Sequence, residues 1–327
     1  MRKSNRGYLL IILACFLWGA SPTISYIALN EIPLFYFVSL RFLIGSLTLF
    51  LIFWKKIKEI SLQNLKACIF TAIFLFSGFA LGAYGYRYVI PMKAAFLMSF
   101  DTVLIPILYA FLFKKKIKNK EIISALIAFI GLFLINFDGL NLELNWGTAI
   151  LLLAALCYAG QAIAVAKAVT WAEPGAVAAI QLGLAGLFSL IPAVSFEQIP
   201  KEVSSSGAIL TVVSGIFCAG VAYYLQAKGQ KYINPVKTGV LFSTTPLFGM
   251  IISGLVLGNT MSLFAVAGSV VIIFAIINIY LDFFGRVGIA RGSKNKDSEE
   301  CDCECNIMQS SQEVESIEPV GISSLKR

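Results

Sequence analysis

The sequence of 327 residues contains no histidine, and charged residues make up only 13% of it. Without histidine, the chain lacks the residue that most often serves as general base or zinc ligand, and it cannot form a Ser-His-Asp triad. It also has no GxxxxGK[ST] phosphate-binding loop, which argues against direct use of ATP. These absences disfavour an enzyme, and we expect no cofactor.

Apolar side chains dominate the chain instead. Hydrophobic residues make up 58% of it and the mean hydropathy is +0.82, far above the values of soluble domains. This composition predicts an integral membrane protein that lies in the lipid bilayer. Because lipid cannot hydrogen-bond to the backbone, such a chain must satisfy its own peptide groups, and we expect an all-α membrane protein.

The apolar residues fall into ten segments, each bounded by charges, Pro or Gly. The first, Tyr8–Leu29, has 22 residues, which is too long for the apolar part of a signal peptide, so it predicts an uncleaved helix. The other nine spans are expected at Pro33–Trp54, Lys66–Tyr86, Met92–Phe113, Ile122–Phe137, Trp146–Val169, Gly175–Phe196, Ala208–Ala227, Val236–Leu257 and Met261–Phe284. Ten transmembrane helices put both ends of the chain on one side of the membrane.

The basic residues between the spans decide which side that is. If the N-terminus is cytoplasmic, the inside segments hold 20 bases and the outside segments hold three, namely Arg87, Lys93 and Lys201. Short cytoplasmic loops carry an excess of Lys and Arg, so this bias predicts that the N and C termini are both cytoplasmic.

A duplicated stretch divides the chain into halves. RYVIPMKAAFL at Arg87–Leu97 recurs as KYINPVKTGVL at Lys231–Leu241, at a constant offset of 144 residues. Five spans per half is an odd number, so the second half must enter the membrane from the opposite side. The sequence therefore predicts two inverted five-helix repeats, at residues 7–137 and 145–284, followed by a tail at 285–327.

Each copy of the duplicated stretch lies between two apolar segments and predicts a hinge. With 141 residues added, Gly19 falls on Gly160 and Gly45 on Gly186, which predicts close helix contacts at these positions in both halves. The residues expected to act in the hinges or in gating are Arg87, Pro91, Lys93, Lys228, Lys231, Pro235 and Lys237.

Four motifs are similar to those of a known family. They are LWGASP at Leu17–Pro22, SLRFLIGSL at Ser39–Leu47, KAAFLMSFDTVLIP at Lys93–Pro106 and AYYLQAKGQKYINPVKTGVLFSTTPLF at Ala222–Phe248. With them the chain, over residues 7–284, resembles the EamA family of the drug/metabolite transporter superfamily.

The resemblance implies a permease of the cell (inner) membrane. It would have ten helices in two inverted repeats and would carry out secondary transport of metabolites, amino acids or drug-like solutes, commonly as efflux. The chain departs from the family at Thr245, where a Glu often precedes the Pro, and at Gly258-Asn259, where the family has Gly-Glu. These departures put in doubt a mechanism that needs an acid in the second half.

Arg41 and Asp101 are the two charges that lie deep inside the expected spans. Each is eight residues from the outer end of its helix, or about 12 Å at 1.5 Å per residue, so they could form an ion pair. An ionisable side chain at that depth faces a partner or an aqueous site. Stapling of two helices and contact with a solute are equal alternatives for this pair, and direct proton coupling is a third.

Aromatic and amide side chains complete the expected substrate site. Gln161 and Gln226 are amides that must find partners within the membrane, whereas Trp18, Tyr84 and Tyr223 could line a solute site or simply pack at an interface. The predicted substrate-binding residues are therefore Trp18, Arg41, Tyr84, Asp101, Gln161, Tyr223 and Gln226.

The C-terminal tail differs in charge from the body. Residues 297–327 hold two bases and eight acids, whereas the preceding residues hold 24 bases and ten acids. Cys301, Cys303 and Cys305 are spaced closely enough to suggest metal binding, but the tail offers no second ligand group. We therefore expect a solvated acidic tail that is disordered and dispensable.

Three other hypotheses about function compete with the transport of a small metabolite. A membrane-embedded enzyme and a channel or scaffold belong to other classes, while a nucleotide-sugar or sugar-phosphate carrier is a different transporter. A dianionic solute would need several deep bases, and Arg41 is the one present, so a neutral or zwitterionic small molecule fits better. We expect a monomer or homodimer with no nucleic-acid partner.

Overall fold

The computed structural model describes residues 3–89, 91–114, 116–137, 145–200, 202–258 and 262–281. The expected tail, including Cys301, Cys303 and Cys305, lies outside the described residues.

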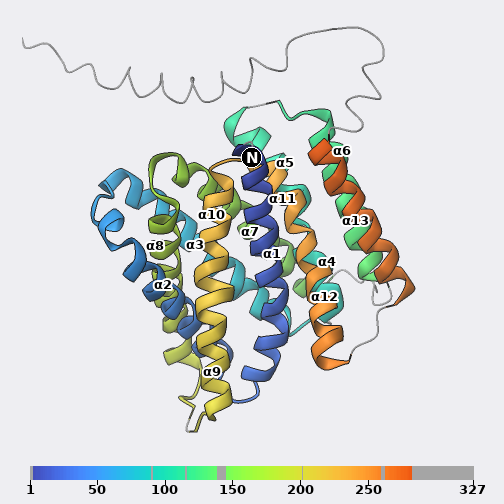
Figure 1. Cartoon of the computed structure of the whole chain (residues 1–327). Helices are drawn as coiled ribbons and strands as arrows, with labels where there is room; N and C mark the ends of the chain where they lie inside the picture. The colour runs from blue at the N-terminus through green and yellow to red at the C-terminus, as the bar shows by residue number, and fades with distance from the viewer. Residues whose placement is uncertain are drawn as a thin grey trace, which may run out of the picture. The chain divides into compact units, whose positions relative to one another are not determined.

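The described residues form helices joined by turns and short connections, with no strand among them (Figure 1). The helices of the first half are α1 (Lys3–Ala28), α2 (Leu34–Lys58), α3 (Leu62–Gly85), α4 (Pro91–Met98), α5 (Asp101–Phe113) and α6 (Asn119–Ile135). Those of the second half are α7 (Trp146–Trp171), α8 (Pro174–Phe196), α9 (Ser205–Val213), the π-helix η2 (Ser214–Val221), α10 (Ala222–Gln230), α11 (Pro235–Phe242), α12 (Thr244–Leu257) and α13 (Leu263–Leu281).

Within the described residues, nine helical stretches are long and apolar enough to cross a membrane. Helix α6 corresponds to the one remaining expected span, Ile122–Phe137. Its 17 residues extend about 25 Å, which is close to the thickness of the hydrocarbon core. The all-α membrane fold expected from the sequence is confirmed.

Two of the spans that the sequence predicts as single helices are broken. The span Met92–Phe113 is divided into α4 and α5, and the span Val236–Leu257 into α11 and α12. Ser99 and Ser243 lie at these breaks, 144 residues apart, and their hydroxyls donate to the carbonyls of Phe96 and Val240, each at 2.6 Å. A serine hydroxyl that bonds to the backbone competes with the helical ladder, and both breaks carry such a serine in the same register.

The span predicted at Ala208–Ala227 also contains irregular structure, because its middle part is the π-helix η2. This segment packs against α2, and a Cβ added at Gly45 of α2 would lie only 2.7 Å from the backbone nitrogen of Gly220. Added Cβ atoms at Gly19, Gly160 and Gly186 would likewise approach neighbouring helices to within 3.0 Å. The close contacts expected at these four glycines are confirmed.

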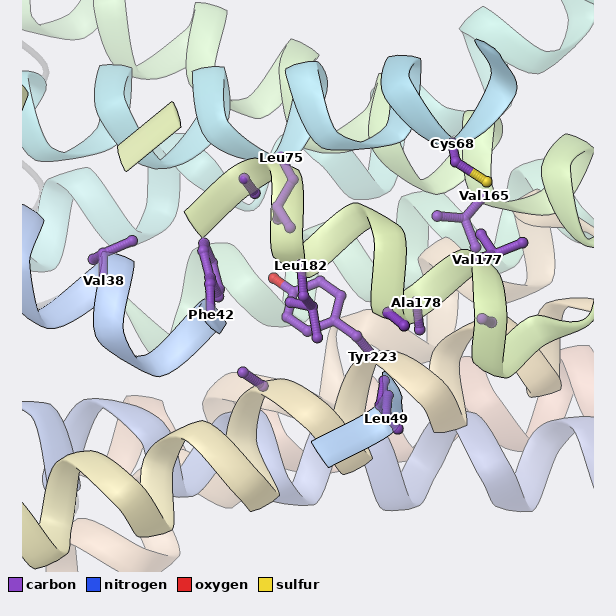
Figure 2. Packing of buried hydrophobic residues seen from close by; sticks show 14 of the residues in the cluster. Val38, Phe42, Leu49, Cys68, Leu75, Val165, Val177, Ala178, Leu182 and Tyr223 are labelled. Carbon is purple, nitrogen blue, oxygen red and sulfur yellow. The ribbon is translucent and has the colours of Figure 1, made fainter. Parts of the chain in front are cut away.

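The helices pack mainly between the halves. Helix α2 lies against α8, α6 against α13, α3 against α7, and α1 against α10 and α12. The pairs α2 with α8 and α6 with α13 each join corresponding helices of the two halves. The largest apolar cluster draws on α2, α3, α7, α8 and α10, and Figure 2 shows Phe42, Leu182 and Tyr223 within it.

Candidate functional site

Arg41 lies on α2 with its side chain buried between the two halves, and the residue is 5% exposed. Its Nη1 donates to Ser21 Oγ of α1 at 2.9 Å, and its Nη2 donates a long bond of 3.5 Å to the carbonyl of Cys218 in η2. The guanidinium carbon is 5.7 Å from the ring centroid of Phe42 and 5.9 Å from that of Phe37. The Nε–H is buried and has no partner among the described residues.

The ion pair expected between Arg41 and Asp101 is not formed among the described residues. Asp101 begins α5 directly after the break in the span, and it accepts a hydrogen bond from Thr102 Oγ1 at 3.3 Å. A carboxylate in the first turn of a helix is stabilised by the peptide dipoles. The prediction was wrong because equal depth does not bring two helices together: α5 packs on α7, α11 and α6, whereas α2 packs on α8 and η2.

Trp18 and Tyr223 form an aromatic wall beside Arg41. Their ring centroids are 5.1 Å apart, and the ring of Trp18 also lies 5.4 Å from that of Phe242. The ring of Tyr223 is 6.1 Å from that of Phe42, and the guanidinium of Arg41 lies near the same Phe42 ring (Figure 2). The indole Nε1 of Trp18 is buried without a hydrogen-bond partner among the described residues.

We call Arg41, Ser21, Trp18, Cys218 and Tyr223 the arginine cluster. It combines side chains of the first half with a side chain and a carbonyl of the second. Sequence reasoning found three of its members and missed Ser21 and Cys218. Ser21 follows Trp18 by three residues, and this one-turn spacing is a signal that could have found it.

Gln161, Gln181 and Gln226, which we call the amide cluster, meet within the second half. Gln161 Nε2 donates to Gln181 Oε1 at 3.2 Å and to Gln226 Oε1 at 3.3 Å, while Gln226 Nε2 donates to Gln161 Oε1 at 3.1 Å. All three residues are less than 5% exposed. Gln161 and Gln226 were predicted to contact the solute, and that role stays a prediction. Gln181 was missed, although it too is an amide within an apolar span.

The second hinge is held by a buried carboxylate that sequence reasoning missed. Asn234 caps α11 by accepting from the backbone N–H of Lys237 at 2.9 Å, and its Nδ2 donates to Glu121 Oε1 of α6 at 2.8 Å. Glu121 is 3% exposed. Pro235 occupies the first turn of α11, where its missing N–H leaves no bond unmade.

The remaining basic residues of this region contact the second half itself. Lys231 forms an ion pair with Glu173 at 3.9 Å, and Lys228 Nζ donates to the hydroxyl of Tyr224 at 2.8 Å. Their gating role stays a prediction.

The hydrogen bonds described around the first hinge involve no residue of either cluster. Pro91 begins α4, Arg87 and Tyr84 are exposed, and the hydroxyl of Tyr88 donates to that of Tyr84 at 2.9 Å. The side chains of Pro91 and Lys93 lie outside the described residues.

The described residues also contain a cavity away from the arginine cluster, and they offer no metal site. A cavity of about 390 Å³ is lined by Asn145 and by residues of the first two turns of α7. Among the described residues, no group of three His, Cys, Asp or Glu side chains could hold a metal ion.

Comparison with known proteins agrees with this fold. The model of the EamA-like transporter family matches the chain twice, at residues 5–137 and at residues 145–281. The chain is 26% identical over 272 residues to the uncharacterized transporter YetK of Bacillus subtilis (strain 168), covering 79% of this chain and 81% of the relative. It is 28% identical over 241 residues to the uncharacterized transporter YyaM of the same organism, covering 69% and 77%.

One solved crystal structure superposes on the chain with a TM-score of 0.74 at 17% identity. The match covers 84% of this chain and 96% of the other. At that identity the likeness supports the fold alone.

Proposed function

Because the chain belongs to the EamA-like transporter family, and is therefore a multi-pass membrane transporter, we propose that it is a secondary transporter. It exports a small metabolite, amino acid or drug-like solute by alternating access between two inverted five-helix repeats. The repeats occupy residues 7–137 and 145–284.

The observation that carries this proposal is the state of Arg41. A buried guanidinium is costly in a membrane protein unless it has a partner or a function. Among the described residues, no carboxylate pairs with Arg41, and its neighbours come from α1 of the first half and η2 of the second. A charge held between two halves that move relative to one another is suited to recognising a solute.

Three features support alternating access. Each half has an odd number of spans, which inverts the second half relative to the first. The pairs α2 with α8 and α6 with α13 are corresponding helices that meet across the two halves. The breaks at Ser99 and Ser243 interrupt one span of each half at the same place. Since Arg41 is 5% exposed, a solute reaches it only after helices separate.

The orientation follows from the loop charges. The 20 bases in the inside segments, against three in the outside segments, support N and C termini that are both cytoplasmic. Membership of the EamA-like transporter family supports a location in the cell (inner) membrane. The hinge at Arg87–Lys93 then faces outward, and the hinge at Lys231–Lys237 faces the cytoplasm.

Transport is tested with purified protein in liposomes. Vesicles loaded with one unlabelled solute, from a panel of amino acids, organic acids and neutral solutes without a carboxylate, are diluted into the same solute in labelled form. A carrier accumulates the label transiently by counterflow, with a rate that saturates. A linear, non-saturating flux would indicate a channel and contradict alternating access.

A further inference from the structure

Four buried side-chain polar atoms lack a hydrogen-bond partner among the described residues. Two of them, Nε of Arg41 and Nε1 of Trp18, are N–H donors and belong to the arginine cluster. The other two, Ser214 Oγ and Gln230 Oε1, belong to neither cluster. A buried N–H without an acceptor is costly, so two of them in one small region need an explanation.

The two donors lie close to one another in the fold. Ser21, which accepts from Arg41 Nη1 at 2.9 Å, is one turn beyond Trp18 on the same face of α1. The Trp18 ring is 5.1 Å from that of Tyr223, and the Tyr223 ring is 6.1 Å from that of Phe42. The guanidinium carbon of Arg41 is 5.7 Å from the same Phe42 ring. The indole and the guanidinium therefore border the same place between α1, α2 and α10.

One edge of the guanidinium of Arg41 is almost unused. Nη1 is bonded to Ser21, but the Nε and Nη2 edge carries a single long bond of 3.5 Å, to the Cys218 carbonyl. The Nε and Nη2 hydrogens of arginine are parallel and match the two oxygens of a carboxylate. The indole N–H adds a third donor, and no acidic side chain among the described residues pairs with the charge.

We propose that the Nε edge of Arg41 and the indole N–H of Trp18 bind the carboxylate of the transported solute. This rests on the proposed transport function and adds the chemical class of the solute, a molecule with one carboxylate next to an apolar part. The rings of Tyr223 and Phe242, which both pack on Trp18, contact that apolar part. A single buried base balances one negative charge, so a dianionic phosphate fits poorly.

The position of Trp18 allows a direct binding measurement. The chain has four tryptophans, and the other three, Trp54, Trp146 and Trp171, are 43%, 84% and 45% exposed. Replacing those three by Phe leaves Trp18 as the single indole at little cost to packing. Its fluorescence and the melting temperature of the protein in detergent then report what binds beside Arg41.

The ligands are three carboxylates, each compared with its neutral amide: acetate, propanoate and 3-phenylpropanoate. Acetate is small enough to enter a carboxylate site whatever the shape of the natural solute. We expect the carboxylates to change the emission of Trp18 and to raise the melting temperature at concentrations about 10- to 100-fold lower than their amides. Phenylalkyl phosphonate, the dianionic comparison, should bind no better than the amide.

Two variants and one control variant locate the effect. Arg41→Gln should abolish the preference for carboxylate over amide, whereas Lys56→Gln, which removes an exposed charge from the same helix, should leave it unchanged. Trp18→Phe keeps an aromatic ring but removes the indole N–H, and it should weaken carboxylate binding as measured by melting temperature. If Arg41→Gln does not fold, the ligand pairs on the parent protein and Trp18→Phe still decide.

Equal binding of all three carboxylates and their amides would overturn the inference, as would a preference that survives Arg41→Gln. The liposome counterflow measurement is independent of these titrations. Carboxylate binding without counterflow would refute transport and keep the site, while counterflow restricted to neutral solutes would refute the site and keep transport.

Discussion

The arginine cluster and the amide cluster are both buried among apolar helices, yet they treat their polar groups in opposite ways. In the amide cluster, Gln161 and Gln226 exchange hydrogen bonds at 3.1 and 3.3 Å, and Gln181 accepts a further bond at 3.2 Å. In the arginine cluster, two N–H donors are left without an acceptor among the described residues. A network in which the polar groups are paired with one another stabilises the fold, whereas unpaired N–H donors can bind a ligand.

The difference also separates two kinds of contact between helices. The amide cluster joins α7, α8 and α10, which all belong to the second half. The arginine cluster joins α1 and α2 of the first half to η2 and α10 of the second. A contact that must open during transport is expected between halves, and a contact that must hold is expected within one.

The largest effect is expected when the arginine cluster loses its charge. Arg41→Gln should reduce transport of a carboxylate solute by about 100-fold, because a charge-assisted hydrogen bond contributes about 1.5–3 kcal/mol. The melting temperature should stay the same or rise, since an unpaired buried charge does not stabilise the fold. Counterflow and melting are measured on the same preparation, with Lys56→Gln as control, and a variant that is unfolded as well as inactive would make Arg41 structural.

An intermediate effect is expected when the amide cluster loses one of its three glutamines. Gln226→Leu leaves both polar ends of Gln161 short of a partner and should lower the free energy of unfolding by about 1–3 kcal/mol. Replacing Gln161, Gln181 and Gln226 together by Leu should recover much of that loss, because no buried amide is then left unpaired. Thermal unfolding in detergent measures both. If the single variant is as stable as the parent but cannot transport, the amides contact the solute instead.

The smallest effect concerns the link between Arg41 and Asp101. Since their side chains do not contact, the effects of Arg41→Gln and Asp101→Asn on stability should add, with a coupling energy below about 0.5 kcal/mol. A double-mutant cycle of melting curves measures this quantity. A coupling of several kcal/mol would restore the ion pair that the sequence suggested.

The depth of Arg41 and the duplicated hinge could be read from the sequence, because charge in an apolar span and a repeated motif are both local signals. The partner of Arg41 could not, since equal depth leaves open which way each helix faces. The breaks at Ser99 and Ser243 were also hidden, because apolar residues continue through them. Glu121 was overlooked because it follows a run of lysines, although the fold buries it against Asn234.

The most direct test compares the reach of solvent into the two clusters during transport. Cysteine is placed at position 21 or at position 226 in a variant without the seven native cysteines, and a small membrane-permeant thiol reagent is applied to liposomes. Position 21 lies beside Arg41 and leaves its guanidinium in place. We predict that position 21 reacts during turnover and is protected by a carboxylate solute, whereas position 226 stays unreactive. Equal reaction at both positions, or protection at 226 but not at 21, would contradict this prediction.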